Sequence, residues 1–285
     1  MRGGFRRPNG RSLRSTRVSE ATLRARGQWL HAPGGDVLAH LLALQAQDVR
    51  TPARALAVRG SALHDGMRIS WMMRQTLHLV HARDLEWLHP LFAPRMEATN
   101  VRRLRQLGVT GADRAVELIA ARVPATRAEL KAHLAGHGVV VEGQAIVHLL
   151  ARAAMQGRIV MDTERVFVPL RLTGGFDREA ALEELARRYG ASHAGATRDD
   201  LAYWSGLPLR DCREPGPCAV SDGPVPRVEL PAFDELLLGW RDRSPTVPPA
   251  FAAAVHPGGG IIRAVTLVDG VVAQVAGSSR SPKRA

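Results

Sequence analysis

Apolar positions in the first hundred residues recur first at helical spacing and then at strand spacing. The pattern predicts helices over 19–30, 36–44 and 51–58, which begin at a serine, an aspartate and a Thr-Pro pair that favour helix starts. Apolar residues then alternate over 67–80, which predicts one or two strands. Helices followed by strands in this way are the order of elements in a winged helix-turn-helix unit.

The same order recurs in the middle of the chain. A capping box opens a helix over 126–136, a second helix covers 143–155, and apolar residues alternate on both sides of a turn within 159–168. A third copy follows, in which a capped helix over 197–206 ends at a glycine and Pro208 opens another helix. The sequence therefore predicts tandem winged helix-turn-helix units.

From about residue 225 the pattern changes to short apolar runs and strand-like alternation. Residues 261–275 alternate and turn at Asp269-Gly270, which strongly favours a β-hairpin, and a polar tail follows. We therefore expect a small, truncated β-barrel. The full prediction is an α+β fold, mainly α with β, divided into a disordered basic N-terminus (1–17), three winged-helix units (18–100, 101–175 and 176–224), a partial β-barrel (225–277) and a basic tail (278–285).

Positive charge is concentrated at the two ends of the chain. The 285 residues carry a formal net charge of +12, but six arginines lie in the first 17 residues and three basic residues in the last eight, which leaves 30 basic and 27 acidic residues between them. Such ends attract any polyanion without sequence preference. The alternative is a general arginine bias, since only two of the 39 basic residues are lysines.

Composition and absent motifs narrow the class of protein. The chain is 45% hydrophobic, but it has no run of about 18 apolar residues and no apolar segment after its basic start, so we expect neither a membrane span nor a secretory signal. Cys212 and Cys218 are expected to be free thiols of a cytoplasmic protein. The sequence contains no four-ligand metal set and no P-loop, so no metal and no cofactor is predicted.

Gln45 and Gln47 flank one alanine at the end of an apolar stretch. A glutamine amide is neutral at any pH, and it holds water by donating and accepting hydrogen bonds at once. Residues i and i+2 do not share a helix face, but they do share a face in extended backbone, where both amides can converge on one water. The alternative is a pair of capping glutamines that satisfy exposed backbone groups at a helix end.

Further candidates lie in the predicted strands, the second unit and the β domain. His78 stands in an apolar run, where a histidine is usually a satisfied core residue. The helix over 143–155 is the expected recognition helix of the second unit, with a solvated helix face as the alternative. The possible site residues or DNA contacts are Arg74, His78, Arg152, Arg158, Arg165, Asp234, Arg241 and Arg243, and for the last three the alternative is an ion-pair network that braces the β domain.

Five sequence strings, in this order and spacing, carry a resemblance to a known family. They are L-x-x-L-Q-A-Q at 41–47, R-Q-T-L-H-L-V at 74–80, T-R-A-E-L at 126–130, W-S-G-L-P at 204–208 and L-P-A-F-D-E-L-L-L-G-W-R-D-R at 230–243. Over roughly residues 18–275 the chain resembles the winged-helix DNA-binding family that includes the bacterial AlkZ and YcaQ DNA glycosylases, and its Q-x-Q form is similar to the AlkZ-like branch.

The resemblance implies excision of N7-alkylated purines, including those in interstrand crosslinks, with Gln45 and Gln47 as the catalytic residues. Alkylation at N7 makes the purine cationic, so the base leaves without a protonating acid and the sugar passes through an oxocarbenium-like state. The implied partner is double-stranded DNA, bound by a monomer associated with the nucleoid. Such an enzyme is a monofunctional hydrolase that leaves the strand intact.

One departure from the family pattern leaves two other functions open. Family members usually continue well past the Asp269-Gly270 hairpin, whereas this chain passes into its basic tail. A barrel with fewer strands exposes an edge and apolar surface. One alternative to a glycosylase is therefore a truncated, inactive paralogue. Another is a DNA-binding protein or regulator of the same fold without catalysis, because fold alone does not settle function.

Overall fold

The computed structural model describes residues 18–32, 34–48 and 50–277. The predicted basic N-terminus (1–17) and basic tail (278–285) lie outside the described residues. Helices make up 45% of the described residues and strands 13%, and the sheets are antiparallel. The prediction of a mixed α+β fold that is mainly α is therefore confirmed.

Short helices and strands alternate in the N-terminal part. They are α1 (Glu20–Gly27), α2 (Val37–Leu41), β1 (Leu44–Gln45), α3 (Thr51–Ala57), β2 (Met67–Trp71) and β3 (Leu77–His81). Ser19 and Asp36 cap α1 and α2, as predicted. The predicted helix over 36–44 was too long. It ends at Leu41 because Leu42 adopts a positive φ of 69°, and the next residues then pair with β3 as a strand.

A long helix, α4 (Leu85–Gln106), leads into the second group of elements. They are α5 (Ala112–Arg122), α6 (Arg127–Gly136), α7 (Ala145–Met155), β4 (Ile159–Met161) and β5 (Phe167–Pro169). The capping box of Thr126 with Glu129 is confirmed, and so is the hairpin within 159–168. Ile69 of β2 pairs with Met161 of β4, so both hairpins belong to one sheet of order β1-β3-β2-β4-β5.

The C-terminal part holds both helices and a second sheet. Its elements are α8 (Arg178–Ser192), α9 (Arg198–Ser205), β6 (Val228–Leu230), α10 (Glu235–Leu238), α11 (Pro249–Val255), β7 (Val265–Val268) and β8 (Val271–Val275). The Asp269-Gly270 turn joins β7 to β8, as predicted. The predicted helix after Pro208 is only one 3-10 turn, Leu209–Asp211. It stops there because Cys212 is extended, with φ −81° and ψ 137°.

The repeats and the barrel stay predictions. Helix α4 runs without a break across the predicted boundary between residues 100 and 101, and the first two predicted units share one sheet. In the described part of the chain the C-terminal sheet has three strands, in the order β6-β7-β8. The architecture is therefore established as two antiparallel sheets surrounded by helices.

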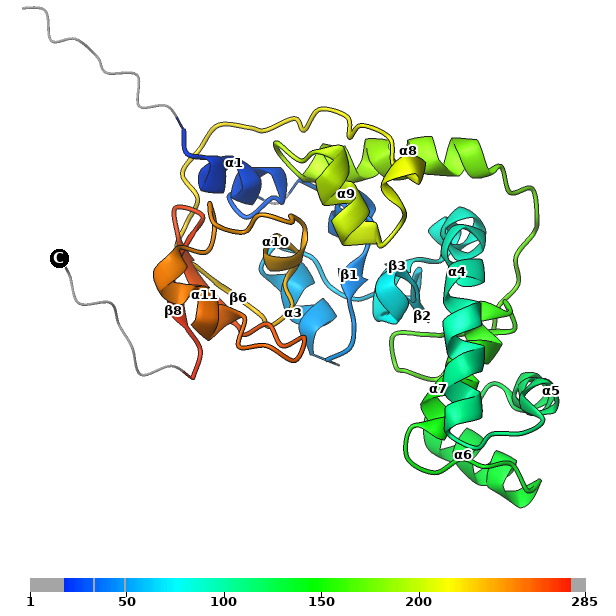
Figure 1. Cartoon of the computed structure of the whole chain (residues 1–285). Coiled ribbons are helices and arrows are strands. Elements are labelled where there is room, and N and C mark those ends of the chain that lie inside the picture. Colours follow the sequence, from blue (N-terminus) through cyan, green and yellow to red (C-terminus); the bar gives the residue numbers. More distant parts are fainter. Residues whose placement is uncertain (1–17, 33, 49, 278–285) are drawn as a thin grey trace, which may run out of the picture.

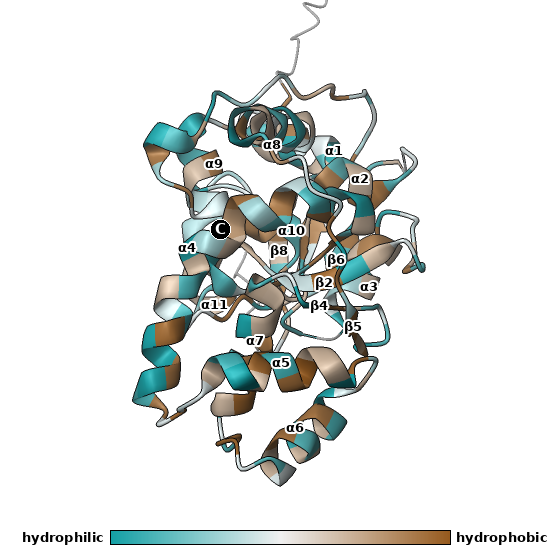
Figure 2. Cartoon of the chain, turned by 90° about the vertical axis from the view of Figure 1, so that its right-hand side faces the viewer, coloured by the Kyte–Doolittle hydropathy of each residue, from teal (hydrophilic) through white to brown (hydrophobic). Residues whose placement is uncertain are grey.

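Two apolar cores hold these elements together. The larger core extends from α2 to α9 and includes the five-stranded sheet, whereas the smaller one packs α1, α10 and α11 against the three-stranded sheet. Figure 1 shows the helices α4 to α7 as an arm that extends away from the rest of the molecule. Hydrophilic and hydrophobic residues alternate along α5 and α6 in Figure 2, as expected for helices that bury one face.

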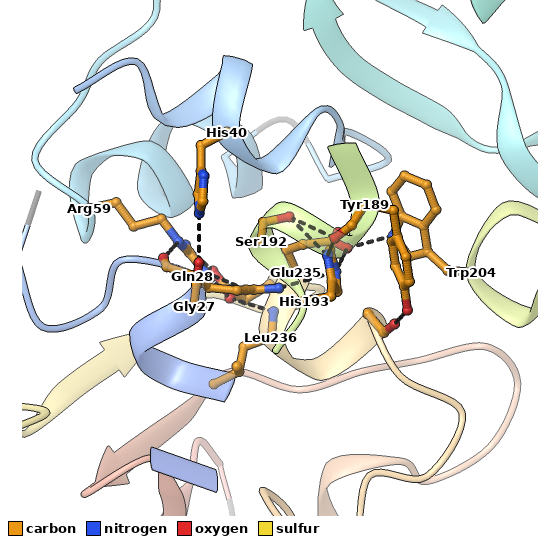
Figure 3. Close-up of polar contacts among 12 residues, drawn as sticks. Gly27, Gln28, His40, Arg59, Tyr189, Ser192, His193, Trp204, Glu235 and Leu236 are labelled. Atoms are coloured by element: carbon orange, nitrogen blue, oxygen red, sulfur yellow. Dashed lines mark hydrogen bonds and ion pairs between the residues drawn. The ribbon is translucent and has the colours of Figure 1, made fainter. Parts of the chain in front are cut away.

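A buried polar network joins residues just after α3 and α8 to α9 and to the start of α10 (Figure 3). Arg59 and Asp234, whose side chains are both 0% exposed, form an ion pair with two hydrogen bonds of 2.9 Å. Beside it, the His193 ring contacts Glu235 at 3.1 Å, and the indole N–H of Trp204 donates to the same carboxylate oxygen at 2.5 Å. Because buried charges are tolerated only when paired, this network fixes how these helices meet.

Candidate functional site

Gln45 and Gln47 lie in extended backbone rather than on a helix end. Gln45 belongs to β1 and pairs with His78 of β3, and the Ala46 N–H donates to the Leu77 carbonyl at 2.8 Å. The Gln45 side chain is buried, whereas Gln47 lies just past the strand and is exposed. The sequence left a helix end or extended backbone open for this pair, and the structure shows extended backbone. The two side chains line different cavities, so the convergence of both amides on one water stays a prediction.

Gln47 lines the larger cavity, which has a volume of about 650 Å³. Its walls are mostly apolar and include Trp71 and Phe167, whose rings stack with centroids 6.4 Å apart. Asn100 lines it too, although this side chain is only 1% exposed. The Asn100 amide donates to the His148 carbonyl at 2.9 Å, and its Oδ1 has no hydrogen-bond partner among the described residues. The cavity therefore has mostly apolar walls, and Asn100 adds a buried acceptor to its polar residues.

Gln45 lines a second cavity of about 300 Å³, on the side of Arg74, Tyr203 and Arg243. The Gln45 Oε1 is buried and accepts no hydrogen bond from the described residues. A buried amide oxygen without a partner costs free energy, about 1–3 kcal/mol, unless another molecule supplies the donor. The geometry is therefore suited to an amide oxygen that accepts a hydrogen bond from a bound molecule.

His78 lies between Gln45 and Ser70 in one row across the sheet. Residues paired in this way project from the same face. The ring Nδ1 donates to the Thr76 carbonyl at 3.0 Å, and burial lowers the pKa of His78 to about 4. The ring is therefore neutral near pH 7, and the sequence-based alternative of a satisfied core histidine matches this position.

Arg165 connects the second hairpin to the glutamine segment. It lies in the β4–β5 turn with a positive φ of 63°, and its Nη2 donates to the Ala46 carbonyl at 2.7 Å. Burial lowers the pKa of this guanidinium, but arginine side chains are not deprotonated in proteins. A cation thus lines the Gln47 cavity and holds the backbone between the two glutamines.

Arg74 and Arg243 both approach Tyr203 beside the Gln45 cavity. Arg74 lies in the β2–β3 turn, and its guanidinium stands 5.6 Å from the centre of the Tyr203 ring. Arg243 stands 5.5 Å from the same ring and donates to its hydroxyl at 2.6 Å. The ring therefore orients two cations next to Gln45.

The other arginines predicted in the second unit are neutralised by carboxylates. Arg152 is only 9% exposed and binds Asp113 at 2.5 Å, while Arg158 binds Glu117 at 2.5 Å. Most of α7, the expected recognition helix, is buried against its neighbours, and its residues Val147 and His148 are only half-buried. Helix α7 is therefore neither an open recognition helix nor a solvated face.

Asp234 and Arg241 stand apart from both cavities. Asp234 is fully buried in the pair with Arg59, and its Oδ1 also accepts from the Leu236 N–H at the start of α10. Arg241 is exposed, with its guanidinium 3.8 Å from Asp199. The ion-pair alternative therefore describes both residues.

Sequence reasoning missed Arg59 and Asn100. Asn100 follows Phe92 and Met96 at four-residue steps and precedes Leu104 by four, so it occupies an apolar helix position. A lone amide in an apolar stripe of this kind is a signal that could have been found. Arg59 gives no such signal, because its partner lies 175 residues away.

The remaining sequence predictions concern metal ions, membrane spans and the two cysteines. The described residues contain no group of three or more His, Cys, Asp or Glu side chains placed to hold a metal ion. Within the same residues, every helix is too short or too polar to cross a bilayer. Cys212 and Cys218 are free thiols, as predicted.

The chain folds as a mixed α+β protein. Two glutamines in extended backbone line two different cavities in it. The sequence profile of the AlkZ-like DNA glycosylases matches residues 38–278, and the chain therefore belongs to the AlkZ-like DNA glycosylase family. Among solved structures, the DNA glycosylase AlkZ of Streptomyces sahachiroi is similar with a TM-score of 0.65 and 20% identity, over 90% of this chain and 86% of that chain. At this identity the likeness shows the fold alone. No functionally curated protein matches the sequence.

Proposed function

We propose that this chain is a DNA glycosylase that hydrolyses the N-glycosidic bond of N7-alkylated purines, with Gln45 and Gln47 positioning the water. The observation that carries the proposal is the buried Gln45 Oε1, which has no partner among the described residues although it sits in the Q-x-Q segment of a DNA glycosylase family. An amide oxygen in this position can accept a hydrogen bond from water. Its carbonyl dipole also favours a developing cation.

The chemistry requires positioning rather than strong acid or base catalysis. In an N7-alkylated purine the bond from C1′ to N9 breaks with its electron pair going to the base, which becomes neutral. Water forms the new bond to C1′ of the oxocarbenium-like sugar and releases its proton to solvent. Neutral glutamines hold the water and stabilise the cation through their oxygens, without taking up the proton themselves.

The nearby His78 is consistent with a reaction that needs no strong acid or base. His78 lies beside Gln45, but its Nδ1–H is committed to the Thr76 carbonyl and its pKa is about 4. A group with this pKa is a poor proton acceptor at neutral pH, because a general base works best with a pKa near the operating pH. His78 therefore supports the strand from which Gln45 projects.

The cavity beside Gln47 supports substrates larger than a methylated base, including purines in interstrand crosslinks. Its volume of about 650 Å³ falls within the range of pockets that take drug-sized molecules, roughly 300–1,000 Å³. The stacked Trp71 and Phe167 rings offer apolar walls. A substituent attached to the purine can occupy this space while the sugar lies near the glutamines.

The test is base release from a duplex that contains N7-methylguanine, measured under single-turnover conditions. We expect release by the wild type, and a loss of at least about 100-fold in rate for the double variant Gln45→Ala/Gln47→Ala. The matched control is Gln156→Ala/Gln274→Ala, which removes two exposed glutamines outside both cavities and is expected to keep the wild-type rate.

The same assay separates the alternatives. If the folded wild type binds the duplex but releases no base above spontaneous depurination, from either the methylated or a crosslinked substrate, the glycosylase proposal is wrong. The chain is then a DNA-binding protein of this family without catalysis, or an inactive paralogue. Release that persists in the double variant would instead refute the role of the glutamine pair.

A further inference from the structure

Several arginines of helix α4 are exposed or half-buried. The buried residues of the helix include Leu88, Phe92, Met96 and Leu104. Arg95 and Arg102 are exposed and lie seven residues apart, which is two helical turns, and the half-buried Arg103 follows. We call Arg95, Arg102 and Arg103 the α4 arginine face. Exposed Arg105 adds a further charge in the last turn.

The described residues do not neutralise the charge of this face. None of its three arginines forms an ion pair with a carboxylate of the residues that the structure describes, and Arg103 instead donates to the amide oxygens of Gln106 and Gln144. The acids of α4 are directed elsewhere, since Glu97 lies 3.7 Å from Arg152. This differs from the second hairpin and α7, where arginines have acidic partners.

The helix dipole explains only part of the pattern. Cations in the last turn of a helix stabilise it by about 0.3–1 kcal/mol, which accounts for Arg103 and Arg105. Arg95 lies about three turns before the end of α4, where the dipole effect has vanished. An uncompensated row of this length therefore indicates an external anion.

The α4 arginine face adjoins the proposed catalytic site. Arg102 and Arg103 line a cavity of about 370 Å³ together with Gln75 and His148. Gln75 and His148 also line the larger cavity that contains Gln47. Polar residues thus connect the cavity of Gln47 to Arg102 and Arg103 of α4, the long helix of the lower arm in Figure 1.

We propose that the α4 arginine face binds the phosphate backbone of double-stranded DNA beside the lesion, and this inference rests on the proposed function. Helical rise places Arg95 about 12 Å from Arg103 along the axis, which corresponds to between three and four base-pair steps. Guanidinium groups bind phosphate oxygens in two-pronged geometry. The contacts fix the register of the duplex and carry no base specificity.

The experiment measures binding of the full chain to an undamaged duplex as a function of salt. Each lost phosphate contact is expected to lower the slope of log K against log salt by about 0.9, so Arg95→Gln/Arg102→Gln/Arg103→Gln lowers it by about 2.7. Between 50 and 200 mM salt, the fall in affinity then becomes roughly 40-fold smaller than for the wild type. Because Arg103 is half-buried, Arg95→Gln/Arg102→Gln serves as a second variant, with an expected decrease of about 1.8.

The matched control is Arg171→Gln/Arg198→Gln/Arg227→Gln, which removes the same charge from exposed arginines that line none of the three cavities. We expect this control to keep most of the wild-type slope. Equal decreases for both triple variants, or no decrease for the α4 variants, would overturn the proposal. Equal binding of single-stranded DNA, lost to the same extent, would overturn the duplex as the occupant.

Failure of this inference and failure of the proposed function are distinguishable. The binding assay uses undamaged DNA and variants with both glutamines intact, so it does not depend on base release. If the wild type releases no base, but the α4 variants bind DNA with a smaller salt slope, the proposed DNA surface is supported and the proposed chemistry is refuted. Base release that depends on the glutamines, with unchanged binding by the α4 variants, refutes the surface alone.

Discussion

The ion pair between Arg59 and Asp234 predicts a large effect from one atom change. Asp234→Asn keeps the shape of the side chain and the acceptor for the Leu236 N–H, but it removes the negative charge. The Arg59 guanidinium, whose side chain is 0% exposed, then stays buried without a counter-charge. Breaking a buried pair in this way costs about 3–5 kcal/mol.

The free energy of unfolding is therefore expected to fall by about 3–5 kcal/mol in Asp234→Asn. For a chain of this size, the corresponding decrease in Tm is about 2 °C per kcal/mol, or roughly 6–10 °C. Asp234→Ala should lose about 1 kcal/mol more, because it also removes the cap of α10. Urea unfolding followed by circular dichroism measures these differences, and Asp199→Asn is the control at an exposed aspartate.

The double variant Arg59→Met/Asp234→Asn tests the electrostatic origin of the effect. It buries no unpaired charge, so it should be less destabilised than the sum of the two single variants, by about 2 kcal/mol. Arg59 also donates to the Gln28 carbonyl and to Gln28 Oε1, so some destabilisation persists in the double variant. A change below about 1 kcal/mol in Asp234→Asn, or strictly additive single variants, would refute the reasoning.

Other measurements address the site, the pH dependence and the thiols. Arg165→Ala removes the hydrogen bond to the Ala46 carbonyl, and base release should slow at least tenfold, about 1.4 kcal/mol, whereas an unchanged rate would exclude a positioning role. The pKa of His78 is about 4 in the fold but 6.5 in the unfolded chain, so the unfolded chain binds more protons between these values. About 3 kcal/mol of stability is therefore present above pH 6.5 and lost as the pH falls towards 4, and urea titrations of His78→Gln should lack this loss. Burial raises the pKa of Cys218 to about 11, so iodoacetamide at pH 8 should label it much more slowly in the fold than in urea, and equal rates would contradict this.

Local signals predicted the parts of the fold that depend on neighbouring residues. The caps at Ser19 and Asp36, the capping box at Thr126 and the turn at Asp269-Gly270 are confirmed, because each requires only a few consecutive residues. The helix over 36–44 was too long because pairing with β3, more than thirty residues further on, outweighs local helix preference.

The sequence by itself determined the α+β class, the helix starts and hairpins, and the Q-x-Q segment with its family. Tertiary structure alone decided which charged residues have no neutralising partner and are free to contact another molecule. Arg152, Arg158 and Asp234 looked like possible contacts, but their partners lie 39, 41 and 175 residues away and neutralise them. It also placed Gln45 and Gln47 beside separate cavities. The physical reason is that charge pairing and burial depend on distances in space, which periodicity along a chain does not encode.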